Sequence, residues 1–177
     1  IFFQKYSQMS RSQQGLAGAG EWETLRKLLP DFKDKRVLDL GCGYGWHCIY
    51  AMEHGASSVV GVDISHKMLE VAKEKTHFPQ VEYKCCAIED VEFPEESFDV
   101  ILSSLAFHYV ADYEILVKKI YRILKSGGKL VFTVEHPVFT AYGTQDWYYN
   151  EKGEILHFPV DNYYYEGKRT AVFLGEK

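Results

Sequence analysis

The amino-acid sequence predicts an α/β fold with a doubly wound, mostly parallel sheet and helices on both faces. Short apolar runs alternate with amphipathic segments, and the first of these runs ends in an acid followed by closely spaced glycines. Such alternation requires crossover connections, which are right-handed in nearly all parallel sheets. The expected strands cover residues 36–40, 58–62, 81–84, 98–103 and 129–135, and the expected helices cover residues 45–54, 65–75 and 113–124.

The elements that flank these strands have their own signals. Residues 1–20 are polar and rich in glycine, so we expect them to close over the site as an N-terminal lid segment. An amphipathic stretch at residues 21–29 follows, and Pro30 ends it. In the helix expected at 113–124 the apolar side chains share one face, and Asp112 precedes it as a capping residue.

The C-terminal part has a different composition. Residues 136–177 are rich in aromatic and turn residues, with strand-like pieces at 155–158 and 170–174 that we expect to pair as an antiparallel hairpin. This tail is either a reduced closing hairpin of the sheet or an insertion that covers the substrate, and we favour the insertion. We therefore expect residues 1–177 to form one domain with a core at 36–135, from which the C-terminal end of the fold is missing.

The stretch Val37–Gly45 is the most informative part of the chain. An apolar run ends there in an acid, and alternating glycines follow, which is typical of a buried strand that turns sharply into a helix. Because glycine has no Cβ, a ligand can lie directly against the backbone of such a loop. Asp63 ends the next apolar run, roughly 20 residues further on, where a ribose-binding carboxylate is expected. The pattern predicts a cofactor that contains adenosine.

The spacing of the glycines distinguishes between such cofactors. A dinucleotide site needs a third glycine where this chain has Trp46. The pattern Asp39-x-Gly41-x-Gly43-x-Gly45 resembles instead the first motif of the class I S-adenosylmethionine-dependent methyltransferases. Two alternatives remain open at this point: an NAD(P)-dependent oxidoreductase on a Rossmann-type unit, and a non-catalytic nucleotide-binding protein.

The resemblance continues in the same order along most of the chain. Residues 61–65 are similar to the second-strand motif of that family, residues 86–90 to its adenine loop, residues 97–104 to its fourth strand and residues 124–130 to the turn before its fifth. The resemblance implies a Rossmann-like fold of the methyltransferase type 11 kind, with S-adenosyl-L-methionine as the cofactor. It also implies in-line transfer of the sulfonium methyl group to a small-molecule acceptor.

The same resemblance implies roles for individual residues. Asp39 is expected to favour the ammonium and sulfonium end of the cofactor, Asp63 to accept hydrogen bonds from both ribose hydroxyls, and Arg11 to bind the cofactor carboxylate. Ile88 is expected to cover the adenine ring, with Glu89 in place of the usual acid of that loop. The complete expected set of cofactor-binding residues is Tyr6, Arg11, Asp39, Gly41, Cys42, Gly43, Asp63, Ile64, Met68, Ile88, Glu89 and Ser103.

Three residues are candidates for catalysis. His108 follows the fourth predicted strand, and Glu135 and His136 end the fifth, at the sheet edge where ligands bind in this architecture. Histidine exchanges protons near neutral pH, so it suits the removal of a proton from the acceptor. Because the ligand-pair spacing of a zinc site is absent, we expect no metal.

Composition limits the partners of this protein. The net charge of −5 and the pI near 5.8 argue against a nucleic-acid substrate, which requires a basic surface. Apolar runs approaching the roughly 20 residues of a membrane span are missing, as is a secretory signal, so we expect a cytoplasmic protein without a membrane partner. An exposed sheet edge would favour a homodimer.

Overall fold

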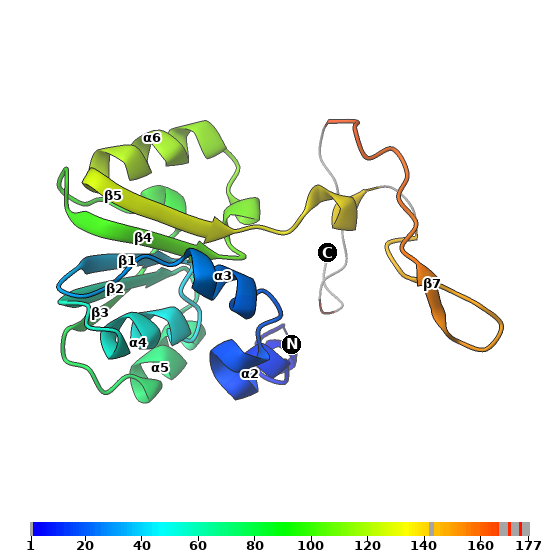
Figure 1. Ribbon diagram of the computed structural model, residues 1–177, viewed down its shortest axis with the longest axis horizontal. Helices are drawn as coiled ribbons and strands as arrows, with labels where there is room; N and C mark the ends of the chain where they lie inside the picture. Colours follow the sequence, from blue (N-terminus) through cyan, green and yellow to red (C-terminus); the bar gives the residue numbers. More distant parts are fainter. Residues whose placement is uncertain (1, 142–143, 167–169, 171–173, 175–177) are drawn as a thin grey trace. The chain divides into compact units, whose positions relative to one another are not determined.

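A computed structural model describes residues 2–141, 144–166, 170 and 174, and these residues form two compact units. One unit is Ser7–Val134 (Figure 1). The other consists of the described parts of Ile1–Tyr6 and Glu135–Lys177.

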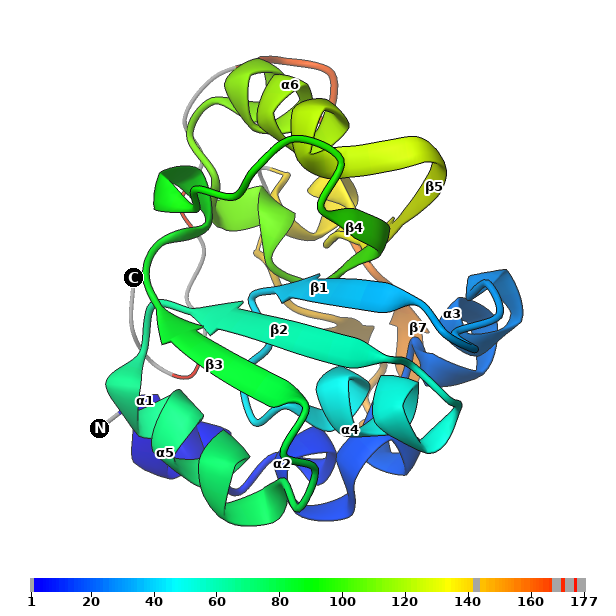
Figure 2. The ribbon, with the colours of Figure 1, turned by 90° about the vertical axis from the view of Figure 1, so that its left-hand side faces the viewer.

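A five-stranded parallel sheet forms the centre of the unit Ser7–Val134 (Figures 1 and 2). The strand order is β3-β2-β1-β4-β5, so the chain moves outward from β1 to β3, returns to β4 on the other side of β1 and ends at β5. The direction of winding therefore reverses between β1 and β4, as the doubly wound prediction requires. The strands are β1 (Arg36–Leu40), β2 (Ser58–Asp63), β3 (Val81–Cys85), β4 (Phe98–Ser104) and β5 (Leu124–Thr133).

Helices cover both faces of this sheet, which confirms the predicted fold class. Helix α6 lies on one face, and α4 and α5 lie on the other (Figures 1 and 2). The predicted cap is present, because Asp112 accepts a hydrogen bond from the N–H of Ile115 at 2.9 Å. Ser65 caps α5 in the same way and accepts a hydrogen bond from the N–H of Met68 at 3.4 Å. The helices that pack on the sheet are α3 (Trp22–Leu28), α4 (Trp46–Glu53), α5 (His66–Lys75) and α6 (Tyr113–Ile123).

The side chains along each strand point alternately to the two faces of the sheet, which divides the core into two layers. Leu38 and Leu40 of β1 pack into the cluster that contains the apolar face of α6, whereas Val37 packs into the cluster that contains Cys48 and Ala51 of α4. All five side chains are fully buried. Successive strand residues point to opposite faces, so nearly continuous apolar strands supply both layers.

Two local features differ from the sequence prediction. Strand β5 begins at Leu124 rather than at residue 129, because Leu124 already pairs with Phe98 and the register then shifts across the glycine turn before Lys129 pairs with Val100. The polar leader also contains two short helices in this unit, α2 (Ser10–Gln14) and η1 (Gly15–Gly18). Its predicted role as a lid stays a prediction.

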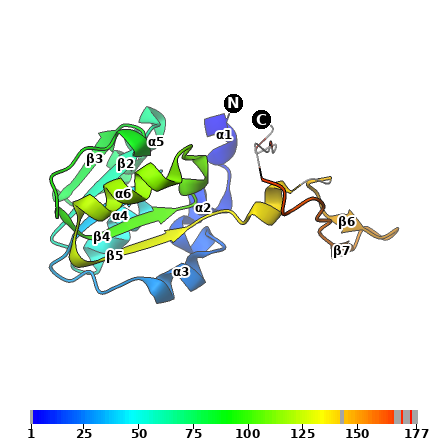
Figure 3. The ribbon, with the colours of Figure 1, turned by 90° about the horizontal axis from the view of Figure 1, so that it is seen from above.

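The second unit contains the aromatic segment. Strand β6 (Tyr148–Tyr149) pairs antiparallel with β7 (Ile155–His157), as Figure 3 shows. We expected residues 170–174 to pair with β7, but residues 171–173 lie outside the described residues, so that pairing stays a prediction. Asn150 closes the tight turn by accepting hydrogen bonds from the N–H groups of Lys152 and Glu154. A short loop costs less closure entropy than a long one.

This unit also contains α1 (Phe2–Tyr6) and the 3-10 helix η4 (Pro137–Thr140). Within the described parts of the chain, no helix is both long and apolar enough to cross a membrane.

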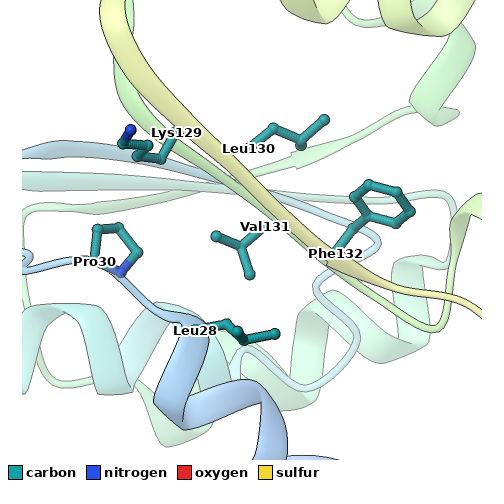
Figure 4. Close-up of a pocket in the computed structure, with 6 residues that line it drawn as sticks. All are labelled: Leu28, Pro30, Lys129, Leu130, Val131 and Phe132. Atoms are coloured by element: carbon teal, nitrogen blue, oxygen red, sulfur yellow. The ribbon is translucent and has the colours of Figure 1, made fainter.

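The outer side of β5 borders a groove of about 530 Å³ (Figure 4). Among the described residues β5 has a strand neighbour on one side only, so it is an edge strand of the sheet. The groove follows β5 beside α3 and is mostly apolar, and its lining residues are Leu28, Pro30, Lys129, Leu130, Val131 and Phe132.

Candidate functional site

The glycine loop between β1 and α4 is held in place by its own backbone. The N–H groups of Gly41 and Cys42 donate hydrogen bonds to the carbonyl of Val62 at 2.8 and 2.9 Å, which joins the ends of β1 and β2. Gly41 has a φ of 79°, and a Cβ there would overlap the Cβ of Ala106. The loop can pass between β2 and the end of β4 only without a side chain at this position.

Asp63 ends β2 and faces this loop. Its Oδ2 accepts a hydrogen bond from the N–H of Gly43 at 2.9 Å, and its Oδ1 accepts one from that of Ser65 at 2.8 Å. Burial raises the pKa of Asp63, and the two backbone hydrogen bonds partly oppose this effect. Each carboxylate oxygen has a second lone pair, so the fixed carboxylate can still accept hydrogen bonds from two vicinal hydroxyls.

Asp39 lies beneath the loop rather than on its surface. The residue is 1% exposed, its Oδ2 accepts a weak hydrogen bond from the thiol of Cys48 at 3.5 Å, and its Oδ1 has no partner among the described residues. Burial, together with the charge of Asp63, raises the pKa of Asp39 to about 7 against the opposing effect of the Cys48 hydrogen bond. A buried acceptor without a donor suits a site that receives a positive charge.

The remaining residues predicted for the adenine side lie around the ends of β2 and β3. Ile64 is 74% exposed immediately after β2, and Met68 is buried in the first turn of α5. Ile88 opens the 3-10 helix η2 (Ile88–Asp90), and its Cδ1 would lie 3.6 Å from a Cβ on Gly41. The structure therefore brings Ile88 to the glycine loop. The Glu89 side chain is exposed, and its backbone carbonyl accepts a hydrogen bond from Lys119.

Two predicted residues use their polar atoms within the sheet or the loop. Ser103 is 1% exposed and donates its hydroxyl hydrogen bond to the carbonyl of Leu40 at 2.8 Å, which ties β4 to β1. Cys42 is also buried, and its backbone N–H is one of the donors to Val62. Both residues therefore support the shape of the loop from below, and their role in binding stays a prediction.

A hydrogen-bond network at the ends of β4 and β5 was not predicted from the sequence. Glu21 forms an ion pair with Arg11 and accepts a hydrogen bond from the hydroxyl of Ser104 at 3.0 Å. Thr133 donates to Ser104 at 3.3 Å and accepts, through its Oγ1, a hydrogen bond from the N–H of Leu105 at 3.2 Å. The network joins the N-terminal helices to the two strand ends.

The conformation at this strand end is unusual. Leu105 has a φ of 54°, in the left-handed region that a residue with a large side chain rarely adopts. Two hydrogen bonds from its N–H to Thr133 hold it there, one to the carbonyl oxygen at 2.9 Å. Strained residues that are fixed in this way are concentrated at functional sites. The sequence contains no local signal for this turn, because it depends on a threonine on the neighbouring strand.

Arg11 was predicted to bind the cofactor carboxylate, and in the structure it contacts Glu21. Its guanidinium pairs with Glu21, which starts α3, and both side chains are about four-fifths buried. Burial, and then the positive charge of Arg11, lower the pKa of the nearby His47 to about 4, so this histidine is neutral at physiological pH. The predicted contact between Arg11 and a cofactor carboxylate remains a prediction.

The three candidate catalytic residues fall in different units. His108 is exposed in the 3-10 helix η3 (Phe107–Tyr109) after β4, with its ring 4.3 Å from that of Tyr109. Glu135 and His136 belong to the second unit, as does Tyr6. There the Nδ1 of His136 accepts a hydrogen bond from the N–H of Val138 at 3.2 Å. His108 therefore belongs to the unit that contains the parallel sheet, and the other two candidates belong to the second unit.

In the described part of the chain, no group of three or more histidine, cysteine, aspartate or glutamate side chains is placed to hold a metal ion.

Comparisons with known proteins identify the family. The family described as "Methyltransferase domain" matches residues 38–132. A protein of Listeria monocytogenes, whose crystal structure is assigned to the S-adenosylmethionine-dependent methyltransferases, is 57% identical; the match has a TM-score of 0.81 and covers 89% of this chain and 74% of that chain. An S-adenosylmethionine-dependent methyltransferase of Mesorhizobium loti is 41% identical, with a TM-score of 0.75 and coverage of 84% and 68%.

A further relative is an uncharacterised protein of Haemophilus influenzae, which is 37% identical over 182 residues; the match covers 96% of this chain and 69% of that protein. The chain thus belongs to the class I S-adenosylmethionine-dependent methyltransferases, in the methyltransferase domain family. This membership confirms the predicted family, with S-adenosylmethionine as the cofactor of the class. It also decides against the oxidoreductase alternative.

Proposed function

We propose that this protein transfers the sulfonium methyl group of S-adenosylmethionine to a small-molecule acceptor by in-line displacement. The observation that carries the proposal is the position of the Asp63 carboxylate, which the N–H groups of Gly43 and Ser65 hold across the glycine loop. Ligands of open parallel sheets bind at this edge, where the winding direction reverses.

The residues around the loop fit such a cofactor. Asp63 accepts hydrogen bonds from the ribose hydroxyls, and Gly41 lets the loop pass close to Ala106 and Ile88. Ile64 and Ile88 supply apolar surface for the adenine ring. The buried carboxyl of Asp39 provides a negative charge beneath a cationic ligand.

The bound cofactor supplies a methyl group that its sulfonium makes reactive. The C–S bond breaks with its electrons on sulfur while the acceptor forms the new bond to carbon, so the protein has to align the acceptor and remove its proton. We propose His108 as the base, because it is exposed directly after β4. Glu135 and His136 are the alternative candidates for this role or for contacting the acceptor.

A small acceptor agrees best with the charge of the chain. At a net charge of −5 the protein lacks the basic excess that nucleic-acid substrates require. A homodimer through the unpaired edge of β5 is a further proposal, to be tested by the mass of the protein in solution.

The experiment is a screen of metabolites against the protein with S-adenosylmethionine, followed by release of S-adenosylhomocysteine. The proposal expects release with one chemical class of acceptor. His108→Ala should then lower kcat by about 100-fold or more with an unchanged cofactor affinity, as expected for loss of a general base. The matched control is His77→Ala, which removes another exposed histidine away from β4.

Two results would contradict parts of this proposal. Unchanged turnover of His108→Ala would assign the proton transfer to another residue. Tight binding of S-adenosylmethionine without turnover of any acceptor would favour the non-catalytic alternative.

A further inference from the structure

Asp39 lies in surroundings that offer its carboxyl few hydrogen-bond donors. The carboxyl is 1% exposed, one oxygen has no partner among the described residues, and the other accepts only a thiol hydrogen bond from Cys48 at 3.5 Å. An isolated carboxylate in such a place lacks the donors that stabilise its charge. The protonated form avoids this cost.

The ionisable groups near Asp39 do not supply a positive charge. Cys42 lies in the glycine loop, Cys48 on α4, Asp63 on β2 and Tyr83 on β3, and each of them is neutral or negative. Burial raises the pKa of the Cys48 thiol and also that of the Tyr83 hydroxyl. Both groups therefore stay protonated at neutral pH. The negative charge of Asp63 further disfavours a negative charge on Asp39. The raised pKa of Asp39, about 7, agrees with this geometry.

We infer that Asp39 holds a proton in the free protein and loses it to the solvent when the cationic cofactor binds at the glycine loop. In this step the O–H bond of the carboxyl breaks, its electrons stay on the carboxylate and the proton passes to the buffer. The inference rests on the proposed function, since it requires S-adenosylmethionine as the ligand.

The physical reason is reciprocal linkage. A positive charge placed close to a buried carboxyl in a medium of low dielectric constant favours the ionised form. By the same amount the ionised carboxyl favours the bound cation, so cofactor affinity must rise as the pH rises. At 1% exposure Asp39 acts through its charge from beneath the loop, as a positioning residue and not as a direct ligand.

The test is calorimetric titration of the protein with S-adenosylmethionine at several pH values between 6 and 9, in two buffers of different ionisation enthalpy. The difference in heat between the buffers counts the protons released. We expect nearly one proton per cofactor at pH 6, falling toward zero at pH 9, with affinity rising up to about tenfold per pH unit in the acidic part.

Two variants test whether Asp39 is the group that releases the proton, and a third variant is the control. Asp39→Asn should lose this proton release, and any proton that the cofactor itself loses remains as the background. Cys48→Ser should move the midpoint to lower pH, because a hydroxyl is a stronger donor to the ionised carboxyl than a thiol. Asp99→Asn is the matched control: this acid of the same sheet accepts hydrogen bonds from Arg36 and Lys125 and should leave the linkage unchanged.

The outcomes separate the two proposals. Binding of S-adenosylmethionine without pH-dependent proton release, or with equal release in Asp39→Asn, overturns the inference and leaves the proposed function intact. An unchanged midpoint in folded Cys48→Ser overturns it as well. The absence of binding at every pH overturns the proposed function and the inference together.

Discussion

The two ends of the ligand edge are built in different ways. At the ends of β1 and β2, the backbone makes the site: the loop N–H groups bond to Val62, and Asp63 is held by Gly43 and Ser65. At the ends of β4 and β5, side chains make it, through Glu21, Ser104 and their partners. A site that the backbone forms can be predicted from a short sequence motif. A site that side chains from distant segments form cannot be predicted in this way.

The largest effect is expected at the backbone-built end. Gly41→Ala places a Cβ against that of Ala106 and forces a side chain into the left-handed region at a φ of 79°. The two effects together should cost about 2–5 kcal/mol of stability. Binding of S-adenosylhomocysteine should fall below detection, measured by calorimetry on folded protein.

The matched control for this variant is Gly127→Ala. Gly127 has a similar φ of 77°, but a Cβ there would meet nothing within 4 Å. Only the conformational cost of about 1–2 kcal/mol should remain, with unchanged cofactor affinity. Equal loss of affinity in both variants would show that the close approach of Gly41 and Ala106 does not shape the site.

The next effect concerns the charge beneath the loop. In the folded protein the pKa of Asp39 is raised from 3.8 to about 7, so folding takes up a proton between these values. The resulting stability is present below pH 4 and is lost as the pH rises through 7. Asp39→Asn should therefore gain stability relative to the wild type as the pH rises, by at most about 4 kcal/mol at pH 8.

Urea unfolding of both proteins at pH 4 to 8 measures this difference, and comparison at the same pH cancels the titration of other groups, His47 included. A constant difference across this range would mean that Asp39 ionises normally in the folded state.

The side-chain-built end should be less sensitive. Glu21→Gln replaces the charge in the ion pair with Arg11 and should cost about 1–2 kcal/mol, because both side chains are mostly buried. The exposed pair of Glu114 and Lys118 on α6 provides the comparison, and Glu114→Gln should cost at most about 0.5 kcal/mol. Thermal unfolding of the two variants ranks them, and equal losses would remove the distinction between the network and a surface pair.

The sequence was sufficient for the strands apart from the ends of β5, for the cap at Asp112 and for the glycine loop, because each has a signal in neighbouring residues. The periodicity around Val37 and Leu38 defines a strand buried on both faces, and the positive φ of Gly41 belongs to its motif. The left-handed Leu105 could not be predicted, since Thr133 on another strand holds it. The pairing of β7 with β6 was not predicted either, and it depends on the turn that the Asn150 side chain closes.

The central claim is that Asp63 and the glycine loop bind the adenosine part of S-adenosylmethionine. The most direct measurement is calorimetric titration of the wild type and of Asp63→Ala with S-adenosylhomocysteine, and of the wild type with NAD. We predict binding of S-adenosylhomocysteine alone, and a loss of at least about 1.5–3 kcal/mol in Asp63→Ala from the missing ribose hydrogen bonds. Preferential binding of NAD, or undiminished affinity in the variant, would contradict the account.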